Sequence, residues 1–471
     1  MSTPEVESAD EDGVRGPEER SLGSLPAMAL VAGSMLGIGI FIMPSQVATQ
    51  IQSPGPFLLL WLFGGVSALF GALSVAELGA MLPRAGGDYP YLRLAYGPGV
   101  AFSAGWLQLL AIFPGSLATM AVGTAQFQLP VVMGAWFHWP TDIGLPISPE
   151  AFWATVVIVG LTAVNHIGIV ISGRVQLLLT GIPIGILLAA SLGVLGQNGV
   201  HGGAWEGGNA FEMPPVAAGA LAFLPVYFAY SGWNAAIYVG GEIHQPGRNL
   251  PRALILGTVA VTVLYLLLCV GFLSIFSMDE LANVFEAGTA AAAELFGSVG
   301  VLTVTVLIVF AMLGSINGTV LTGSRIGFAM AAHGHCPAPA GRLHPKYRTP
   351  VVALWVQALW SLVLVGTQSF EELTTYTSAA MLITGTLTVL AVIRLRRKMP
   401  DTVRPYRTWG YPVTPLLYAV SSVFVLLALA TTGDLSVYLA VGWFVLCLGA
   451  HRWLVQRGLL PPDDGAPVPA E

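Results

Sequence analysis

The sequence predicts an all-α integral membrane protein with twelve transmembrane helices, of which the first and the sixth are broken. Three observations support this fold class. Only 9% of the 471 residues are charged, whereas soluble domains contain about 25% charged residues. Apolar runs of about 20 residues, the length of a membrane-spanning helix, recur twelve times along the chain. Two of these runs carry glycine or polar residues near their centres, where they destabilise a continuous helix.

The predicted spans follow one another closely along most of the chain. They cover residues 26–50, 57–82, 98–126, 151–171, 175–196, 214–241, 253–276, 298–322, 350–367, 373–393, 411–430 and 435–454. We interpret residues 26–455 as one transmembrane domain. Residues 1–25 contain seven Asp or Glu and two Arg and are predicted to form a disordered tail, and residues 456–471 a second tail.

The charges of the connecting loops predict the orientation of the chain. With these spans, all 19 Lys and Arg fall on one side, and the opposite loops hold eleven Asp or Glu and no Lys or Arg. Because basic loops stay in the cytoplasm, both termini are expected to be cytoplasmic. A wrong number of spans would scramble this alternation, so it supports the number twelve.

The first span contains a glycine cluster that predicts a broken helix. Residues 30–44 read L-V-A-G-S-M-L-G-I-G-I-F-I-M-P, with glycines at 33, 37 and 39. Each glycine costs a helix interior about 1 kcal/mol relative to alanine. A break at mid-membrane leaves backbone N–H groups that bind anionic ligand groups in secondary transporters. Close helix packing through Gly33 and Gly37 is the alternative interpretation.

The sixth span shows a second irregular segment. It opens with Pro214-Pro215 and contains the segment 228–234, F-A-Y-S-G-W-N, near its middle. Irregular backbone at this depth is tolerated where it lines a cavity or is buried in protein. Spans 1 and 6 each begin a group of five helices. Interrupted helices at corresponding positions of two halves indicate a transporter binding site.

Residues 76–91 read A-E-L-G-A-M-L-P-R-A-G-G-D-Y-P-Y and are followed by A-Y-G-P. This segment resembles the signature of amino-acid permeases of the amino acid–polyamine–organocation (APC) superfamily, A-E-L-G-x-x-x-P-x-x-G-G-x-Y-x-Y. Segments 228–234, 242–252, 314–318 and 404–415 resemble further parts of that family. The resemblance covers roughly residues 26–455 and is closest to the L-type and related bacterial branch.

The resemblance implies a LeuT-like fold of two inverted five-helix repeats, residues 26–196 and 214–393, plus two C-terminal helices at 411–454. It also implies that backbone N–H groups at the first break bind the substrate carboxylate and that carbonyls of both breaks bind its ammonium group. These roles are carried over to Met35, Gly37, Ile38, Gly39, Phe228, Ser231, Gly232 and Asn234. Phe228 has the position of the aromatic extracellular gate.

Two departures from the family pattern affect the expected site. The motif Gly-Ser-Gly is common at the first break, whereas Ile38 stands between the two glycines here. Many relatives carry a lysine in the fifth helix in place of a sodium ion, and Pro183 aligns with that lysine. Coupling through this amine is therefore not expected.

Other ionisable groups are candidates for gating or coupling. Glu77 and Glu242 lie near the inner ends of their spans, and we expect each to pair with a basic residue or gate the inner face, with proton carriage as the alternative. Arg325 is predicted at the inner surface. The short cluster from His333 to Cys336 is not expected to bind a metal, and we expect no cofactor and no nucleic-acid partner.

The expected function is amino-acid transport across the plasma membrane by alternating access, with neither an enzyme nor a catalytic residue predicted. Neutral substrates are favoured because spans 1, 3, 6 and 8 offer no Asp or Glu near mid-membrane. Cationic amino acids or polyamines, and a non-transporting nutrient sensor on the same fold, are the alternatives. Sodium-independent exchange is favoured, with proton symport through Glu77 or Glu242 next. A sodium site would have Ser315 as its one side-chain hydroxyl.

The positions of the cysteines bear on whether the chain has a disulfide-linked partner. The L-type light chains of animals attach to a glycoprotein through a cysteine between helices 3 and 4, and loop 127–150 contains none. We therefore expect no disulfide-linked heavy chain. A prokaryotic protein that acts in its membrane as a monomer or a weak homo-oligomer is predicted.

Overall fold

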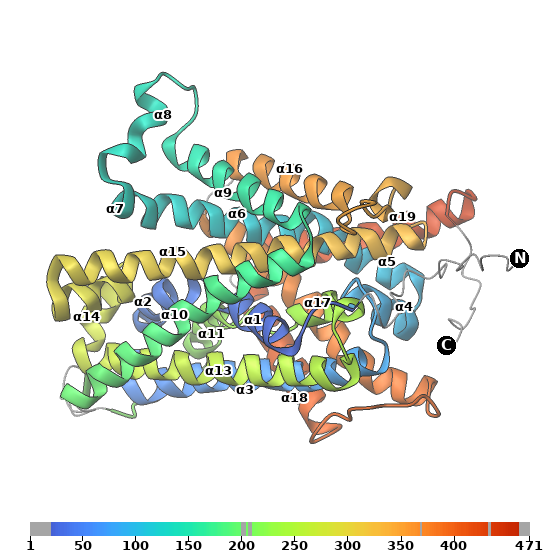
Figure 1. The fold of residues 1–471 in the computed structure, drawn as a ribbon. Coiled ribbons are helices and arrows are strands. Elements are labelled where there is room, and N and C mark those ends of the chain that lie inside the picture. Colours follow the sequence, from blue (N-terminus) through green and yellow to red (C-terminus); the bar gives the residue numbers. More distant parts are fainter. Residues whose placement is uncertain (1–19, 199–203, 206–209, 368–369, 432–434, 461–471) are drawn as a thin grey trace, which may run out of the picture.

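The computed structural model describes residues 20–198, 204–205, 210–367, 370–431 and 435–460. Within these residues the chain is mostly helical, and its β-structure is limited to two isolated bridges. Figure 1 shows a bundle of long helices, with α15 (Ala287–Ala332) extending along most of it and the shorter α1 (Ser24–Met35) and α2 (Gly39–Gln50) inside it. The all-α prediction is confirmed.

Each of the twelve predicted spans corresponds to one helix or to several consecutive helical elements. The further helices of the bundle are α3 (Pro54–Met81), α5 (Pro98–Leu107), α6 (Phe113–Gly123), α9 (Pro149–His166), α10 (Ile169–Asn198), α11 (Val216–Ala229), α12 (Ala235–Tyr238), α13 (Pro246–Ile275), α16 (Val351–Thr367), α17 (Phe370–Lys398), α18 (Val413–Thr431) and α19 (Leu435–Gln456). In the described chain, nine helical stretches are long and apolar enough to cross a membrane, and α11 and α16 contain shorter apolar helices.

Short elements connect these helices. They are α4 (Asp88–Tyr96), η2 (Gln108–Ile112), η3 (Thr124–Gln128), α7 (Leu129–Met133), η4 (Gly134–His138), α8 (Trp139–Asp142), η6 (Gly240–Glu242), α14 (Met278–Asn283) and η7 (Ala338–Gly341). Figure 1 shows α7 and α8 projecting from one end of the bundle. α4 precedes the third predicted span and packs against α17 and α5.

Two boundaries differ from the predicted ones. Leu22 is already ordered, because its N–H donates to Glu242 O (2.9 Å) and its carbonyl accepts from His244 N (2.9 Å). Since α1 begins at Ser24, the ordered part of the transmembrane domain starts a little before residue 26. α15 is much longer than the predicted span 298–322, because a second helix adjoins it at Gly297, whose φ of 61° is non-helical.

Close contacts between helices position the broken segments. A Cβ at Gly257 of α13 would lie 2.9 Å from the Val31 side chain of α1, and a Cβ at Gly65 of α3 would lie 2.3 Å from the Thr262 side chain of α13. Small residues permit such close approach between membrane helices. α13 is therefore held firmly between α3 and the first broken helix.

Candidate functional site

The first membrane-spanning helix stops at Met35 and resumes at Gly39. Leu36 leaves the helical conformation, with φ −76° and ψ 89°. α2 then starts anew, and the first N–H groups of a helix have no carbonyl one turn earlier to bind. The N–H groups of Gly37 and Ile38 accordingly make no backbone hydrogen bond within the described residues. This break exposes donors suited to an anion.

The sixth helix breaks beside the first. α11 ends at Ala229 and α12 begins at Ala235, with turns between them. Gly232 in this turn has φ +95°, and a Cβ there would lie 2.6 Å from the carbonyl oxygen of Ser34. Only glycine fits both the backbone conformation and this contact. Likewise, a Cβ at Gly39 would lie 2.7 Å from Ala229 Cα, so the two breaks touch at both ends.

One tyrosine hydroxyl bridges the two breaks. Tyr265 of α13 is fully buried, and its hydroxyl lies 2.7 Å from Met35 O and 3.1 Å from Ala229 O. Each of these carbonyls belongs to the last residue of a helix, where it lacks an intrahelical donor. The Tyr265 ring packs against Trp61 and Tyr230. Sequence reasoning missed Tyr265, because it lies in a regular helix with no unusual neighbours.

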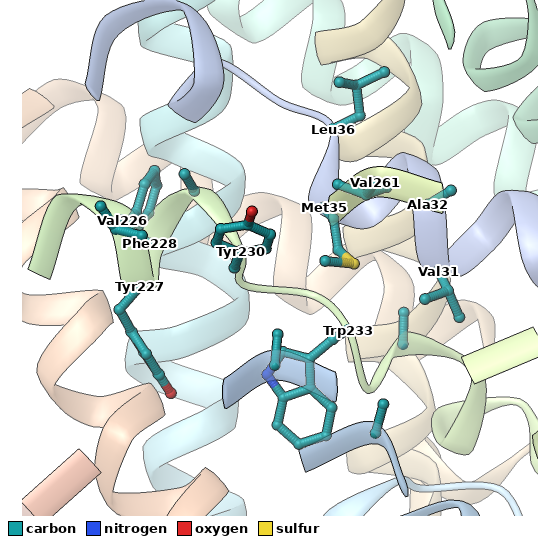
Figure 2. Close-up of a cluster of buried hydrophobic side chains, with 14 of the residues drawn as sticks. Val31, Ala32, Met35, Leu36, Val226, Tyr227, Phe228, Tyr230, Trp233 and Val261 are labelled. Carbon is teal, nitrogen blue, oxygen red and sulfur yellow. The ribbon is translucent and has the colours of Figure 1, made fainter. Parts of the chain in front are cut away.

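A central cavity lies where the breaks meet. Figure 2 shows the side chains that surround this region, including Met35 from the first break and Phe228, Tyr230 and Trp233 from the second. The cavity measures about 90 Å³. Its wall also includes Asp88, Phe113, Ser116, Met120, Tyr238, Ser315, Thr319 and Thr384 from the surrounding helices. All eight residues predicted for substrate binding line it.

A carboxyl group that sequence reasoning missed also faces this cavity. Asp88, the first residue of α4, is 2% exposed and accepts hydrogen bonds at Oδ2 from the Tyr238 hydroxyl (2.7 Å) and Gln108 Nε2 (3.0 Å). Burial raises its pKa to about 6, against the lowering effect of these hydrogen bonds. The turn before it needs glycine, since Gly86 and Gly87 have positive φ. That Gly-Gly-Asp turn was the available signal, but Asp88 lies outside the spans in which acidic residues were sought.

The sequence comparisons agree with this geometry. A family model described as amino acid permease matches residues 22–450. The chain belongs to the amino acid permease family.

Curated relatives match over most of their length. The serine/threonine exchanger SteT of Bacillus subtilis is 30% identical over 90% of this chain and 94% of its own. The large neutral amino acids transporter small subunit 2 of Rattus norvegicus is 31% identical over 85% and 74%. The human b(0,+)-type amino acid transporter 1 is 30% identical over 87% and 82%. The predicted family is therefore confirmed.

Glu77, a candidate for gating or coupling, lies away from the cavity of this permease. Its carboxylate, 1% exposed, accepts from Arg396 Nε (2.8 Å) and Nη2 (2.6 Å) and from the N–H (2.7 Å) and hydroxyl (2.8 Å) of Thr408. Arg404 Nε also lies 3.2 Å from Oε1. Glu77 therefore ties α3 to α17 and to the segment before α18, as expected for pairing with basic residues.

Glu242 and Arg325 form a second ion pair, also outside the cavity wall. Arg325 Nε donates to Oε1 (3.1 Å) and Nη2 to Oε2 (3.4 Å), and Arg325 is 1% exposed. The side chain of Arg325 is therefore buried, and its predicted depth at the inner surface stays a prediction. α15 continues well past the predicted end of its span. The carboxylate of Glu242, which follows α12, lies against Arg325.

Neutral amides form a hydrogen-bonded network beside the first broken helix. Gln176 of α10 donates to Ala29 O (3.3 Å) and to Thr180 Oγ1 (3.0 Å), and accepts from Asn317 Nδ2 (2.8 Å). Asn317 in turn accepts from Asn165 Nδ2 (2.8 Å). Hydrogen bonds between uncharged groups thus join α1, α9, α10 and α15.

The Tyr265 bridge gives the first testable prediction. Tyr265→Phe keeps the ring and leaves two buried carbonyls without their donor, which costs about 1–3 kcal/mol. We expect kcat/KM for transport to fall by about tenfold or more, with the protein still folded. Uptake by proteoliposomes measures this. Tyr438→Phe removes an exposed hydroxyl bonded to Ala430 O (2.9 Å) and should leave uptake unchanged. Equal uptake by Tyr265→Phe and wild type would show that the bridge has no role.

Proposed function

We propose that this permease exchanges small neutral amino acids across the plasma membrane by alternating access, without sodium. The observation that carries the proposal is the cavity between two broken helices, with free N–H groups at Gly37 and Ile38. Such donors favour a carboxylate, and the carbonyls at helix ends favour an ammonium group. A zwitterionic amino acid presents both charges to the two breaks at once.

The size of the cavity favours a small substrate. A volume of about 90 Å³ exceeds the roughly 10–15 Å³ that one water molecule needs but is small beside the roughly 300–1,000 Å³ of common ligand pockets. Ile38 also adds an apolar side chain where many relatives carry serine. The name of the Bacillus subtilis relative, a serine/threonine exchanger, supports the same size class and exchange as the mode of transport.

The polar groups beside the first break support sodium independence. Ser315 Oγ donates to Ser34 O (3.3 Å), so the one hydroxyl considered for a sodium site is already engaged. The amides of Gln176 and Asn317 bond to each other. A hard cation such as sodium needs several oxygen ligands, and the lining of this part of the cavity, Ser34 and Ser315, offers hydroxyls without a carboxylate beside them.

The permease is proposed to act alone, with both termini in the cytoplasm. Loop 127–150 has no cysteine for a disulfide-linked heavy chain, and Cys269 and Cys447 are buried. Transport rather than catalysis is proposed, because the family model that matches the chain describes a permease. The sidedness of the basic residues supports the orientation.

A counterflow assay tests this function. Proteoliposomes loaded with unlabelled L-serine should accumulate labelled L-serine, and empty ones should not. Alanine and threonine should compete best, tryptophan and arginine poorly, and replacing sodium by potassium should change nothing. Saturable accumulation that requires sodium would contradict the coupling. Absence of uptake with every amino acid would favour a sensor on this fold.

A further inference from the structure

Asp88 is the one carboxyl group among the described residues that line the central cavity. The proton-carrying candidates suggested by sequence, Glu77 and Glu242, are both engaged by arginine and lie outside the cavity wall. No salt bridge of the described residues includes Asp88. Its Oδ1 is buried without a hydrogen-bond partner in the described part of the chain. Burying an ionised carboxylate in this way is costly, and taking up a proton removes the charge.

The proposed function provides a reason for the charge of Asp88 to change during transport. A substrate that enters the cavity displaces water, which lowers the local dielectric and disfavours an ionised carboxylate. The substrate also brings its own carboxylate into the same cavity. When the cavity empties, water returns and the ionised form is favoured again.

We propose that Asp88 is a proton-binding site of the transport cycle: its carboxyl takes up one proton when an amino acid fills the cavity and releases it when the cavity empties. The solvated proton comes from the bulk solvent and forms an O–H bond at Oδ1, and this bond breaks and returns the proton to the solvent when the cavity empties. Oδ2 keeps its hydrogen bonds from Tyr238 and Gln108 in both states. This inference rests on the proposed exchange of amino acids and extends it by adding a link to pH.

The surroundings of Asp88 permit both protonation states. First-turn N–H groups of α4 and the donors on Oδ2 favour the ionised form, whereas burial favours the neutral form. The balance sets the pKa at about 6, close enough to neutral pH for a proton to be both bound and released.

The neighbouring groups do not supply the same titration. Groups on the elements packed against Asp88 are Tyr91 and Arg93 of its own helix, Tyr227, Tyr238, Asn234, Gln108, Thr388 and Tyr418. Tyrosine and arginine do not titrate near neutral pH. Four cations of the packed helices α15 and α17 have other partners: Arg325 pairs with Glu242, Arg396 pairs with Glu77, Arg394 lies over the Tyr96 ring, and Lys398 Nζ donates to Leu94 O (3.0 Å).

His335, the histidine that bonds to the helix of Asp88, is also excluded as the source of the titration. His335 bonds to Tyr89, the next residue of α4 (Nδ1 to hydroxyl, 2.8 Å). Burial, with His451 and His333 nearby, lowers the pKa of His335 to about 3. His335 therefore stays neutral across the pH range in which Asp88 changes charge.

Binding of tritiated L-serine to the purified full chain tests the proposal. In the wild type, uptake of one proton should weaken binding by up to about tenfold for each pH unit above the pKa of the empty site, between about pH 6.5 and 7.5. Asp88→Asn mimics the neutral carboxyl, so its affinity should be independent of pH and equal to that of the wild type at low pH. Glu286→Gln is the matched control, because Glu286 is buried, accepts from Gln128 Nε2 (2.8 Å) and lies outside the cavity wall. It should keep the pH dependence.

Other results would overturn the inference. Asp88→Asn that keeps the pH dependence, or Glu286→Gln that removes it, places the proton elsewhere. Affinity that rises with pH and is lost in Asp88→Asn makes Asp88 a ligand of the substrate ammonium group instead.

An infrared titration separates this inference from the proposed function. The carbonyl stretch of a protonated carboxyl should appear as the pH falls, persist to higher pH with L-serine, and vanish in Asp88→Asn. If no amino acid binds the wild type, the exchange function fails. The titration of the empty protein then still shows whether Asp88 holds a proton, and its absence contradicts the assignment.

Discussion

Gly232→Ala is expected to abolish transport while leaving the protein folded. The new Cβ lies 2.6 Å from Ser34 O, and the residue has φ +95°. A left-handed conformation costs a non-glycine residue about 1–2 kcal/mol, and relief of the contact moves the two breaks apart. A displacement of about 1 Å in a binding geometry costs about 100-fold in rate. Counterflow of labelled L-serine, normalised to the protein reconstituted, measures the loss.

A second glycine provides the control for this substitution. Gly271 of α13 is buried, has no atom within 4 Å of a built Cβ and shows no positive φ. Gly271→Ala should transport as the wild type does and gain slightly in stability. Transport by Gly232→Ala within a factor of about three of the wild type would show that the contact between the breaks is dispensable.

Glu77→Ala should cause the largest loss of stability. It leaves Arg396 and Arg404 without their carboxylate and Thr408 N–H without its acceptor. Breaking a buried ion pair by removing one partner costs about 3–5 kcal/mol. We expect the lower end of this range, because Arg396 is partly exposed at 24% of its side chain. Thermal unfolding in detergent measures the change.

Two further variants show where the stability comes from. Glu77→Gln keeps an acceptor for Thr408 and should therefore lose less stability than Glu77→Ala. Glu294→Ala removes an exposed carboxylate of α15 and should leave the melting temperature unchanged. If Glu77→Ala has the same melting temperature as Glu294→Ala, the ion pair does not hold α3 to α17.

The sequence predicts the fold and the breaks well because their physical signals are local. Gly37, Gly39 and Gly232 are unfavourable within a continuous membrane helix, and loop charges determine the number of spans. Asp88 and Tyr265 were missed because their roles depend on distant parts of the chain. Tyr265 meets two carbonyls from helices far away in sequence.

The burial of Arg325 was not predicted, for a related reason. Counting 20 residues from the start of the predicted span puts this side chain at the membrane surface. α15 continues beyond that length, and Glu242, distant in sequence, pairs with Arg325 in the interior. Burial by a distant segment leaves no periodic pattern to read.

The most direct test of the account is competition by serine analogues that lack one main-chain charge. If free N–H groups at Gly37 and Ile38 bind the carboxylate and carbonyls of both breaks bind the ammonium group, each charge is needed. In L-serine counterflow, unlabelled L-serine should compete fully. Ethanolamine, which lacks the carboxylate, and 3-hydroxypropionate, which lacks the ammonium group, should not compete at equal concentration. Full competition by either analogue would contradict binding of the amino acid between the two helix breaks.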